Sequence, residues 1–304
     1  MNMLQDDALM AGASGTQTVA AADGRTLTTA EYGDPDGFPV FSLHGTPGSR
    51  FAGQASGSVY AKVGARVITY DRPGYGGSDR FRGRRVVDCV ADVSAIADSL
   101  GIDRFAVTGG SWGGPHSLAV AARLPGRVTR AASVAGVAPF GMPGFDWFAG
   151  MDAVNIEEIG WALEGEDVLA RELERMTAAW LERLAKDPSE PGAVEFSEAD
   201  RAVMARPERN EAMRRMLNEA FRQGVGGYVD DIFCLIQPWG FDVTEIRVAT
   251  RIDFGLTDVL VPPQHGEWLA HNVPVAEVVI NEQGGHFSAP NVITERLGWL
   301  VQPV

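Results

Sequence analysis

The sequence contains only two cysteines, Cys89 and Cys234, which lie far apart along the chain. Two isolated cysteines have neither the spacing of a metal site nor the density of a disulfide-stabilised scaffold. We therefore expect two free thiols in a reducing compartment, which favours a cytoplasmic protein.

Positive charge is also scarce, since 26 lysines and arginines face 40 aspartates and glutamates, for a formal net charge of −14. A chain this acidic repels phosphate backbones and anionic membrane surfaces, so we expect neither nucleic acid nor a membrane as a partner. No apolar run approaches the length needed to span a bilayer. Residues 1–15 lack the basic and apolar regions of a signal peptide, and we expect them to be a disordered leader.

What the sequence does contain is a regular alternation of strands and helices. Hydrophobic residues make up 45% of its 304 residues, enough for the core of one large α/β domain. Residues 16–22 and 26–32 read as an antiparallel hairpin. Buried strands are then expected at 39–44, 65–71, 104–110 and 127–136, with helices at 86–102 and 112–125. Strands that alternate with helices predict a mostly parallel sheet covered by helices on both faces.

The alternation stops in the middle of the chain. From about Phe140 to Pro238 the sequence is amphipathic and helical, without a convincing buried strand. Strands are again expected at 245–255 and 275–281, and helices at 262–272 and 288–301. The sequence therefore predicts an α/β core formed by residues 16–138 and 241–304, with a helical insert at 139–240.

Four glycines surround one serine in the stretch VTGGSWGGPHSLA, residues 107–119. Its G-x-S-x-G pattern falls between a predicted strand and a predicted helix, where flanking side chains would collide in the tight turn. Glycine removes that collision and leaves the Ser111 hydroxyl at the top of the sheet. The alternative is a purely structural glycine-rich turn, but the strand–turn–helix context favours Ser111 as a nucleophile.

A serine hydroxyl needs a base, and the base needs an acid that orients it. After such a turn the expected chain order is Ser, then Asp or Glu, then His. His286 follows the last predicted strand, and Asp258 follows the strand before it, so both belong to the carboxyl edge of the sheet. Asp253 is the alternative acid, but it lies inside an apolar run. We expect Ser111, Asp258 and His286 to form a catalytic triad.

The tetrahedral intermediate of acyl transfer needs hydrogen-bond donors for its oxyanion. One donor is expected from the backbone N–H of Trp112, the residue after the nucleophile. The second is expected from the loop that begins at His44, with Thr46 as the donor. Pro47 has no N–H, and Gly45 is expected to set the turn.

The five histidines show no metal spacing such as H-x-x-x-H, and we expect neither a metal nor a cofactor. His116 lies one turn along the helix behind Ser111 and is expected to pack in the core. His265 and His271 flank a predicted surface helix, and we expect both to be solvated.

Together, the segments HGTPGS, DRPGYGGSD, GGSWGG, GLTDVLVPP and GGH resemble the α/β-hydrolase superfamily, specifically its capped serine hydrolases with an HGxPG loop. The resemblance implies an eight-stranded sheet with a helical lid after the sixth strand, and an oxyanion loop braced by His44. GGSWGG also looks like the elbow of proline iminopeptidases, which usually carry HGGPG where this chain has HGTPG. Epoxide hydrolases and haloalkane dehalogenases of the superfamily use an aspartate nucleophile, and Ser111 argues against both.

The insert is rich in aromatic residues, most of which should form its own core. We expect Phe140, Phe145, Trp147 and Trp239, together with His44, to line a pocket for a moderately apolar small molecule. The function predicted is that of a carboxylesterase-like serine hydrolase (EC 3.1.1) that cleaves an ester or related acyl bond through an acyl-enzyme. The alternatives are an aminopeptidase like the proline iminopeptidases and a slow-turnover binding or receptor protein. A homo-oligomer remains open.

Overall fold

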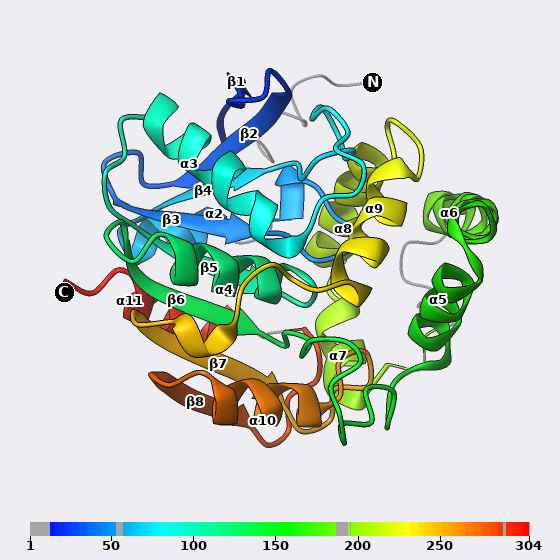
Figure 1. The fold of residues 1–304 in the computed structure, drawn as a ribbon. Coiled ribbons are helices and arrows are strands. Elements are labelled where there is room, and N and C mark those ends of the chain that lie inside the picture. The colour runs from blue at the N-terminus through cyan, green and yellow to red at the C-terminus, as the bar shows by residue number, and fades with distance from the viewer. Residues whose placement is uncertain (1–12, 53–56, 187–193, 195, 288–289, 304) are drawn as a thin grey trace.

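Eight strands form one sheet in the computed structural model, which describes residues 13–52, 57–186, 194, 196–287 and 290–303 (Figure 1). The strands are β1 (Ala13–Ala20), β2 (Thr26–Gly33), β3 (Phe38–Leu43), β4 (Ala65–Tyr70), β5 (Phe105–Gly110), β6 (Val128–Val134), β7 (Ala249–Gly255) and β8 (Ala276–Asn281). Their order across the sheet is β1-β2-β4-β3-β5-β6-β7-β8. The pairs β1–β2 and β2–β4 are antiparallel and the other pairs are parallel. The predicted mostly parallel, eight-stranded sheet is confirmed.

Helices cover both faces of this sheet. They are α2 (Gly57–Lys62), α3 (Cys89–Ser99), α4 (Gly113–Arg123), α10 (Pro263–Asn272) and α11 (Pro290–Leu300), with short 3-10 helices η2 (Val86–Asp88) and η3 (Val243–Glu245). Helices α3, α4 and α10 lie in front of the sheet in Figure 1, whereas α2 and α11 lie behind it and pack against each other. Each face therefore buries its own hydrophobic cluster, one with Phe41, Ile68 and Val107 and the other with Val40, Val67 and Leu297.

The chain between β6 and β7 forms only helices among the described residues. They are α5 (Ala153–Glu164), α6 (Glu166–Lys186), α7 (Glu198–Met204), α8 (Pro207–Ala220) and α9 (Gly226–Ile236). The Asp152 side chain caps α5 by accepting the Val154 N–H, and Ser197 caps α7 by accepting the Asp200 N–H. These five helices, called the lid below, lie beyond the carboxyl ends of the parallel strands (Figure 1).

The expectation of a leader at 1–15 needs one correction. Residues 13–15 belong to β1, which pairs with β2. The first strand of the hairpin therefore begins at residue 13 rather than at residue 16. The first twelve residues of the predicted leader lie outside the described residues. Within the described part of the chain, no helix combines the length and apolarity needed to cross a membrane.

Candidate active site

Ser111 lies in a sharp turn between β5, which ends at Gly110, and α4, which begins at Gly113. Its φ angle is 55°, in the left-handed region that non-glycine residues rarely adopt. The Ser111 N–H donates to the carbonyl of Val134 at 2.8 Å, which fixes the turn against the end of β6. A backbone held in a strained conformation by its surroundings is typical of a functional site, and in this fold of a nucleophile.

The glycines around Ser111 differ in how strictly they are required. A Cβ on Gly109 would lie 2.0 Å from the carbonyl oxygen of Gly113, and one on Gly113 would lie 2.3 Å from that of Leu43. Backbone atoms cannot yield at such distances, so both positions must be glycine. A Cβ on Gly110 would meet nothing within 4 Å. The turn therefore needs glycine two residues before and two residues after the serine, as the G-x-S-x-G pattern predicts.

The structure brings Asp258 and His286 together. His286 Nδ1 lies 2.8 Å from Oδ2 of Asp258, and the Asp258 carboxylate is fully buried. Its other oxygen, Oδ1, accepts the N–H groups of Leu260 and Val261, both at 2.9 Å. Asp253, the alternative acid, pairs instead with Arg296 and Arg251.

The charges around His286 set its protonation. Burial by itself lowers the pKa of the imidazole, but the carboxylates of Asp258 and Asp200 together outweigh burial, and the pKa of His286 is raised above its ordinary value. Within the described residues, no hydrogen bond joins His286 to Ser111 Oγ. Catalytic hydrogen bonds are often long in an unliganded enzyme and shorten when substrate binds.

The loop after β3 lies directly beside Ser111. A Cβ on Gly45 would be 3.2 Å from Cβ of Ser111, so no side chain separates the two residues. Across the described residues, neither the Thr46 N–H nor the Trp112 N–H has a backbone acceptor. Two unpaired donors beside a nucleophile are what an oxyanion requires.

A buried ion cluster beneath this loop could be found only in part from sequence. Asp231, on α9 of the lid, has no exposed surface and pairs with Nη2 of Arg72 and Nη2 of Arg84, each at 2.6 Å. Tyr75 donates its hydroxyl to Asp231 at 3.0 Å, and the Thr46 hydroxyl also donates to it. Burial raises the pKa of a carboxyl group, but the two arginines hold the pKa of Asp231 well below its usual range.

Through this cluster the lid holds the loop formed by residues 44–46. The Arg72 guanidinium donates to the carbonyl of His44, to the carbonyl of Gly45 at 3.1 Å and to the Thr46 hydroxyl at 2.8 Å. The segment DRPGYGGSD, which contains Arg72 and Tyr75, belongs to the resemblance, but nothing in the sequence marked Asp231 as the partner of Arg72.

His44 braces the loop that it begins, as the resemblance implies, and its side chain does not line a pocket for substrate. Its ring is buried, with Nδ1 2.7 Å from the Gly45 carbonyl and Nε2 accepting the Arg72 N–H at 3.1 Å. Burial and then the charge of Arg72 lower the pKa of His44 well below its ordinary value, so the ring is neutral. Because both ring nitrogens are engaged, the side chain braces the loop.

The other expected pocket residues also pack mainly against their neighbours. Trp147 is buried, donates Nε1–H to the carbonyl of Ala138 at 2.8 Å, and contacts the Phe140 ring edge-on at 5.4 Å. Trp239 is buried and stacks on Phe241. Phe140 and Phe145 are only partly buried, so these two retain surface for a substrate.

His265 does not have the solvated position that we expected. It is fully buried, its Nδ1 accepts the Ala138 N–H at 3.1 Å, and its Nε2 faces the carbonyl of Trp147 at 3.0 Å. The ring thereby fixes the segment where the chain enters the lid. His116 is buried in the core as expected, and His271 is exposed.

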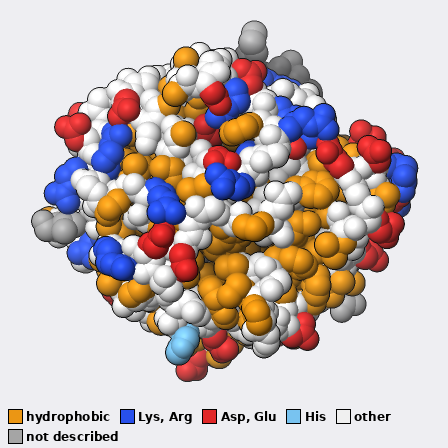
Figure 2. Space-filling model, viewed as in Figure 1, with side chains coloured by type: hydrophobic (Ala, Val, Ile, Leu, Met, Phe, Trp, Pro, Cys, Tyr) orange, Lys and Arg blue, Asp and Glu red, His pale blue; other side chains and the backbone are white. Residues whose placement is uncertain are grey.

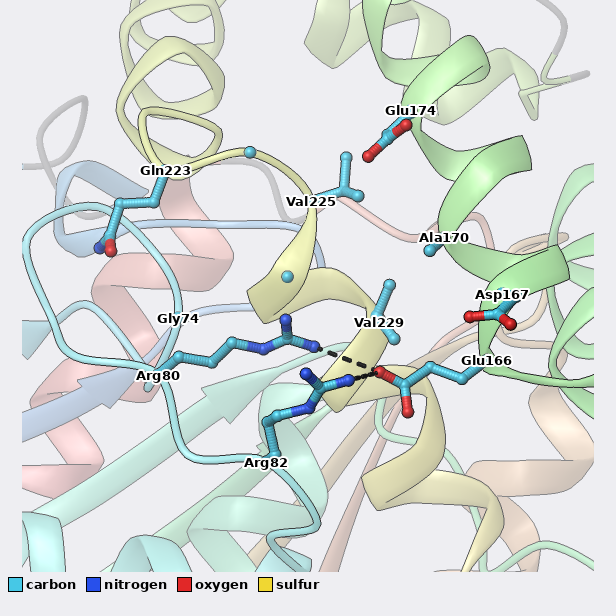
Figure 3. A pocket seen from close by; sticks show the side chains of 12 residues that line it. Gly74, Arg80, Arg82, Glu166, Asp167, Ala170, Glu174, Gln223, Val225 and Val229 are labelled. Atoms are coloured by element: carbon cyan, nitrogen blue, oxygen red, sulfur yellow. Dashed lines mark hydrogen bonds and ion pairs between the residues drawn. The ribbon is translucent and has the colours of Figure 1, made fainter.

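A cavity of about 390 Å³ lies away from these residues, between the loop at 74–82, α6 and the start of α9 (Figure 3). Figure 3 shows Arg80 and Arg82 reaching across it to the same carboxylate, that of Glu166. None of Ser111, Asp258 and His286 lines the cavity. The paired charges indicate a contact between lid and core rather than a catalytic pocket.

Comparison with known proteins agrees with this fold. The family described as "alpha/beta hydrolase fold" matches residues 39–159. Among solved structures, an alpha/beta hydrolase fold protein from Nakamurella multipartita superimposes with a TM-score of 0.67 at 25% identity, over 94% of this chain and 99% of that one. The similarity in fold thus extends over nearly the whole chain, including the lid.

Curated relatives match a shorter stretch. A proline iminopeptidase from Neisseria gonorrhoeae is 39% identical over 101 residues, which is 32% of this chain and 32% of that protein. A non-heme chloroperoxidase from Streptomyces lividans is 35% identical over 124 residues, which is 40% of this chain and 45% of that protein. In both cases the match spans less than half of the relative's length, so it does not carry that protein's substrate over to this chain.

Proposed function

Because this chain belongs to the α/β-hydrolase superfamily, we propose that it is a serine hydrolase that cleaves an ester or related acyl bond of a small molecule. The observation that carries the proposal is the pairing of His286 Nδ1 with the buried Asp258 carboxylate at 2.8 Å. That pairing belongs to the same sheet edge as Ser111, whose strained backbone has the form of a nucleophile elbow.

The proposed reaction consists of two acyl transfers, first to Ser111 and then to water, and His286 moves the proton in both. His286 Nε2 takes the proton of Ser111 as Oγ forms a bond to the carbonyl carbon of the substrate. The oxyanion accepts the N–H groups of Thr46 and Trp112. The tetrahedral intermediate then expels the alcohol, which receives the proton from His286, and an acyl-enzyme remains. Water, deprotonated by His286, attacks the acyl carbon and releases the acid and the free Ser111 hydroxyl.

The surface of the lid supports an apolar substrate. Figure 2 shows hydrophobic side chains gathered over the lid, between α5 and α9. Phe140 and Phe145, where the chain enters the lid, are partly buried and add aromatic surface. We therefore propose that the acyl or alcohol group is moderately apolar and that Phe140 and Phe145 contact it.

The similarity to a proline iminopeptidase keeps an aminopeptidase as the second candidate. Such an enzyme needs free carboxylates in the lid to bind the substrate amine. Of the four lid acids that the sequence offers for this role, Glu157, Glu158, Glu164 and Glu166, two are already paired, since Tyr228 donates to Glu158 at 2.6 Å and Arg82 pairs with Glu166. Burial also raises the pKa of Glu158 to about 7, which weakens it as a permanent anion. Glu157 and Glu164 are exposed, so the substrate assays below decide between the two activities.

Hydrolysis of short-chain p-nitrophenyl esters tests the proposal. The wild-type chain should hydrolyse p-nitrophenyl acetate or butyrate. It should also be labelled by a fluorophosphonate, and peptide mapping should place the label on Ser111. Ser111→Ala should abolish both, while Ser99→Ala, at an exposed serine, should change neither. Turnover retained in Ser111→Ala would refute the mechanism.

Two further outcomes separate the alternatives. Faster cleavage of proline p-nitroanilide than of any ester would establish the aminopeptidase. Fluorophosphonate labelling of Ser111 without measurable ester turnover would instead favour a slow-turnover binding protein.

A further inference from the structure

We propose that Asp200, on lid helix α7, is a positioning residue that holds the backbone of the His286 loop. The lid would then be part of the device that places the base, rather than only a cover over the substrate. The inference rests on the proposed function only in treating His286 as the base.

The contact between Asp200 and the loop is bidentate. Asp200 Oδ2 accepts the N–H of His286 at 3.0 Å, and Oδ1 accepts the N–H of Phe287 at 2.7 Å. Asp200 has no exposed surface. A buried carboxylate that accepts two successive backbone donors fixes both the position and the direction of that backbone.

The lid holds this carboxylate in turn. Ser197, the N-cap of α7, donates its hydroxyl to Asp200 Oδ2 at 2.8 Å and accepts the Asp200 N–H at 3.1 Å. On the other side, a Cβ on Gly285 would lie 2.2 Å from Asp200 Oδ2. The loop can therefore close around the carboxylate only with glycine at this position, so the second glycine of GGH has a physical reason.

His286 is thus held at two points by two different parts of the chain. Asp258, after β7, fixes the imidazole through Nδ1, and Asp200, in the lid, fixes the main chain. If α7 moved away, the His286 and Phe287 N–H groups would lose their acceptor, and buried donors without an acceptor are costly. Displacement of the lid and displacement of the base are therefore one event in this structure.

Three charged groups face the His286 ring from different elements. Asp258 and Asp200 favour the imidazolium, whereas Arg209 on α8 opposes it. The guanidinium of Arg209 lies 5.2 Å from the centre of the Phe287 ring. Removing the charge of Asp200 should consequently lower the pKa of His286 and loosen its backbone at the same time.

The test compares Asp200→Asn with Asp230→Asn. Asp230 is a buried lid carboxylate too, but among the described residues it pairs with Arg80 and makes no hydrogen bond or ion pair to the His286 loop. An asparagine at 200 offers one acceptor oxygen and turns an NH2 group toward a backbone donor. Asp200→Asn should lower kcat for p-nitrophenyl butyrate about tenfold to a hundredfold with little change in KM, because the base is misplaced. Asp230→Asn should leave kcat unchanged.

A second measurement does not need turnover. The pKa of His286, followed by the NMR shift of its Cε1–H and assigned with His286→Asn, should fall in Asp200→Asn and stay the same in Asp230→Asn. A folded Asp200→Asn protein with unchanged kcat and unchanged His286 pKa would overturn the proposal. Absence of ester turnover and labelling in the wild type would refute the proposed function, while the NMR titration would still test Asp200.

If Asp200→Asn does not fold, Ser197→Ala provides the alternative variant. It removes one hydrogen bond to Oδ2 and the cap of α7 but keeps the charge. We expect a several-fold loss of kcat with no change in the pKa of His286. An unchanged kcat would then count against the proposal.

Discussion

His286 Nδ1 lies 2.8 Å from Asp258 Oδ2, while Asp258 Oδ1 accepts two backbone N–H groups. Because a carboxylate only accepts, Nδ1 must carry the proton and donate it. The neutral ring then has its lone pair on Nε2, the atom that must act as the base. The pairing thus selects the tautomer that the proposed mechanism requires.

This pairing leads to a prediction for the pH dependence of activity. The base works only when Nε2 is unprotonated, so kcat/KM must fall as the pH drops through the pKa of His286. That pKa is raised, so the fall should be centred above about 6.5, the ordinary value for histidine. His116 and His265, with pKa values lowered to about 3 and about 4, cannot produce it. A profile of kcat/KM against pH, measured with a non-ionisable ester, checks this prediction. An acidic decrease in kcat/KM that is centred below about pH 6.5 would contradict it.

Asp258→Asn should disable the base without unfolding the protein. An asparagine can turn its NH2 group toward Nδ1, which favours the wrong tautomer, and kcat should fall on the order of 10⁴-fold. Asp253→Asn is the matched control, because Asp253 is also buried but pairs with Arg296 and Arg251. That variant should keep its kcat and lose stability in urea unfolding. The reverse pattern would identify Asp253 as the acid.

Gly109→Ala and Gly110→Ala should differ sharply although the two residues are neighbours. A Cβ at 109 would lie 2.0 Å from a backbone oxygen, whereas one at 110 has open space around it. Overpacking costs about 1–3 kcal/mol and more where the neighbour cannot move, so Gly109→Ala should unfold at lower temperature or fail to fold. Gly110→Ala should melt close to the wild type. Equal melting temperatures for the two variants would show that the turn can relax.

The fold and the tight turn at Ser111 could be predicted because local patterns encode them. Alternating strands and helices specify a parallel sheet, and the glycines around Ser111 specify a turn that admits no side chain at 109 and 113. Chain order then placed Asp258 and His286 at the same edge. Each of these inferences needs only short stretches of sequence and the rule that parallel strands end on one side.

The lid residues that hold the catalytic loops could not be predicted in this way. Asp200 and Asp231 stand in amphipathic helices where an acid normally faces solvent, and both are fully buried. Their burial depends on how the lid packs against the core. A local sequence pattern does not predict that packing. For the same reason His265 was misplaced, since its ring nitrogens contact the backbone of Ala138 and Trp147, which are distant in sequence.

Trp239 provides the sharpest test of the difference between packing and substrate contact. Its side chain is 4% exposed, donates Nε1–H to the carbonyl of Leu235 at 3.3 Å, and stacks on Phe241 at 5.8 Å. Trp239→Ala should therefore cost about 3–5 kcal/mol of unfolding free energy. The ratio of kcat/KM for a short ester to that for a longer ester should stay the same, because the ring is buried against Leu235 and Phe241.

Phe140→Ala is the matched comparison. Phe140 is partly buried, so its truncation should cost less stability and should change the ratio of kcat/KM between the short and the longer ester. Urea unfolding and the two ester assays on the same preparations separate the effects. A stable Trp239→Ala protein with altered ester preference would place that ring in the substrate pocket after all, because a side chain that only packs cannot change which ester is preferred without changing stability.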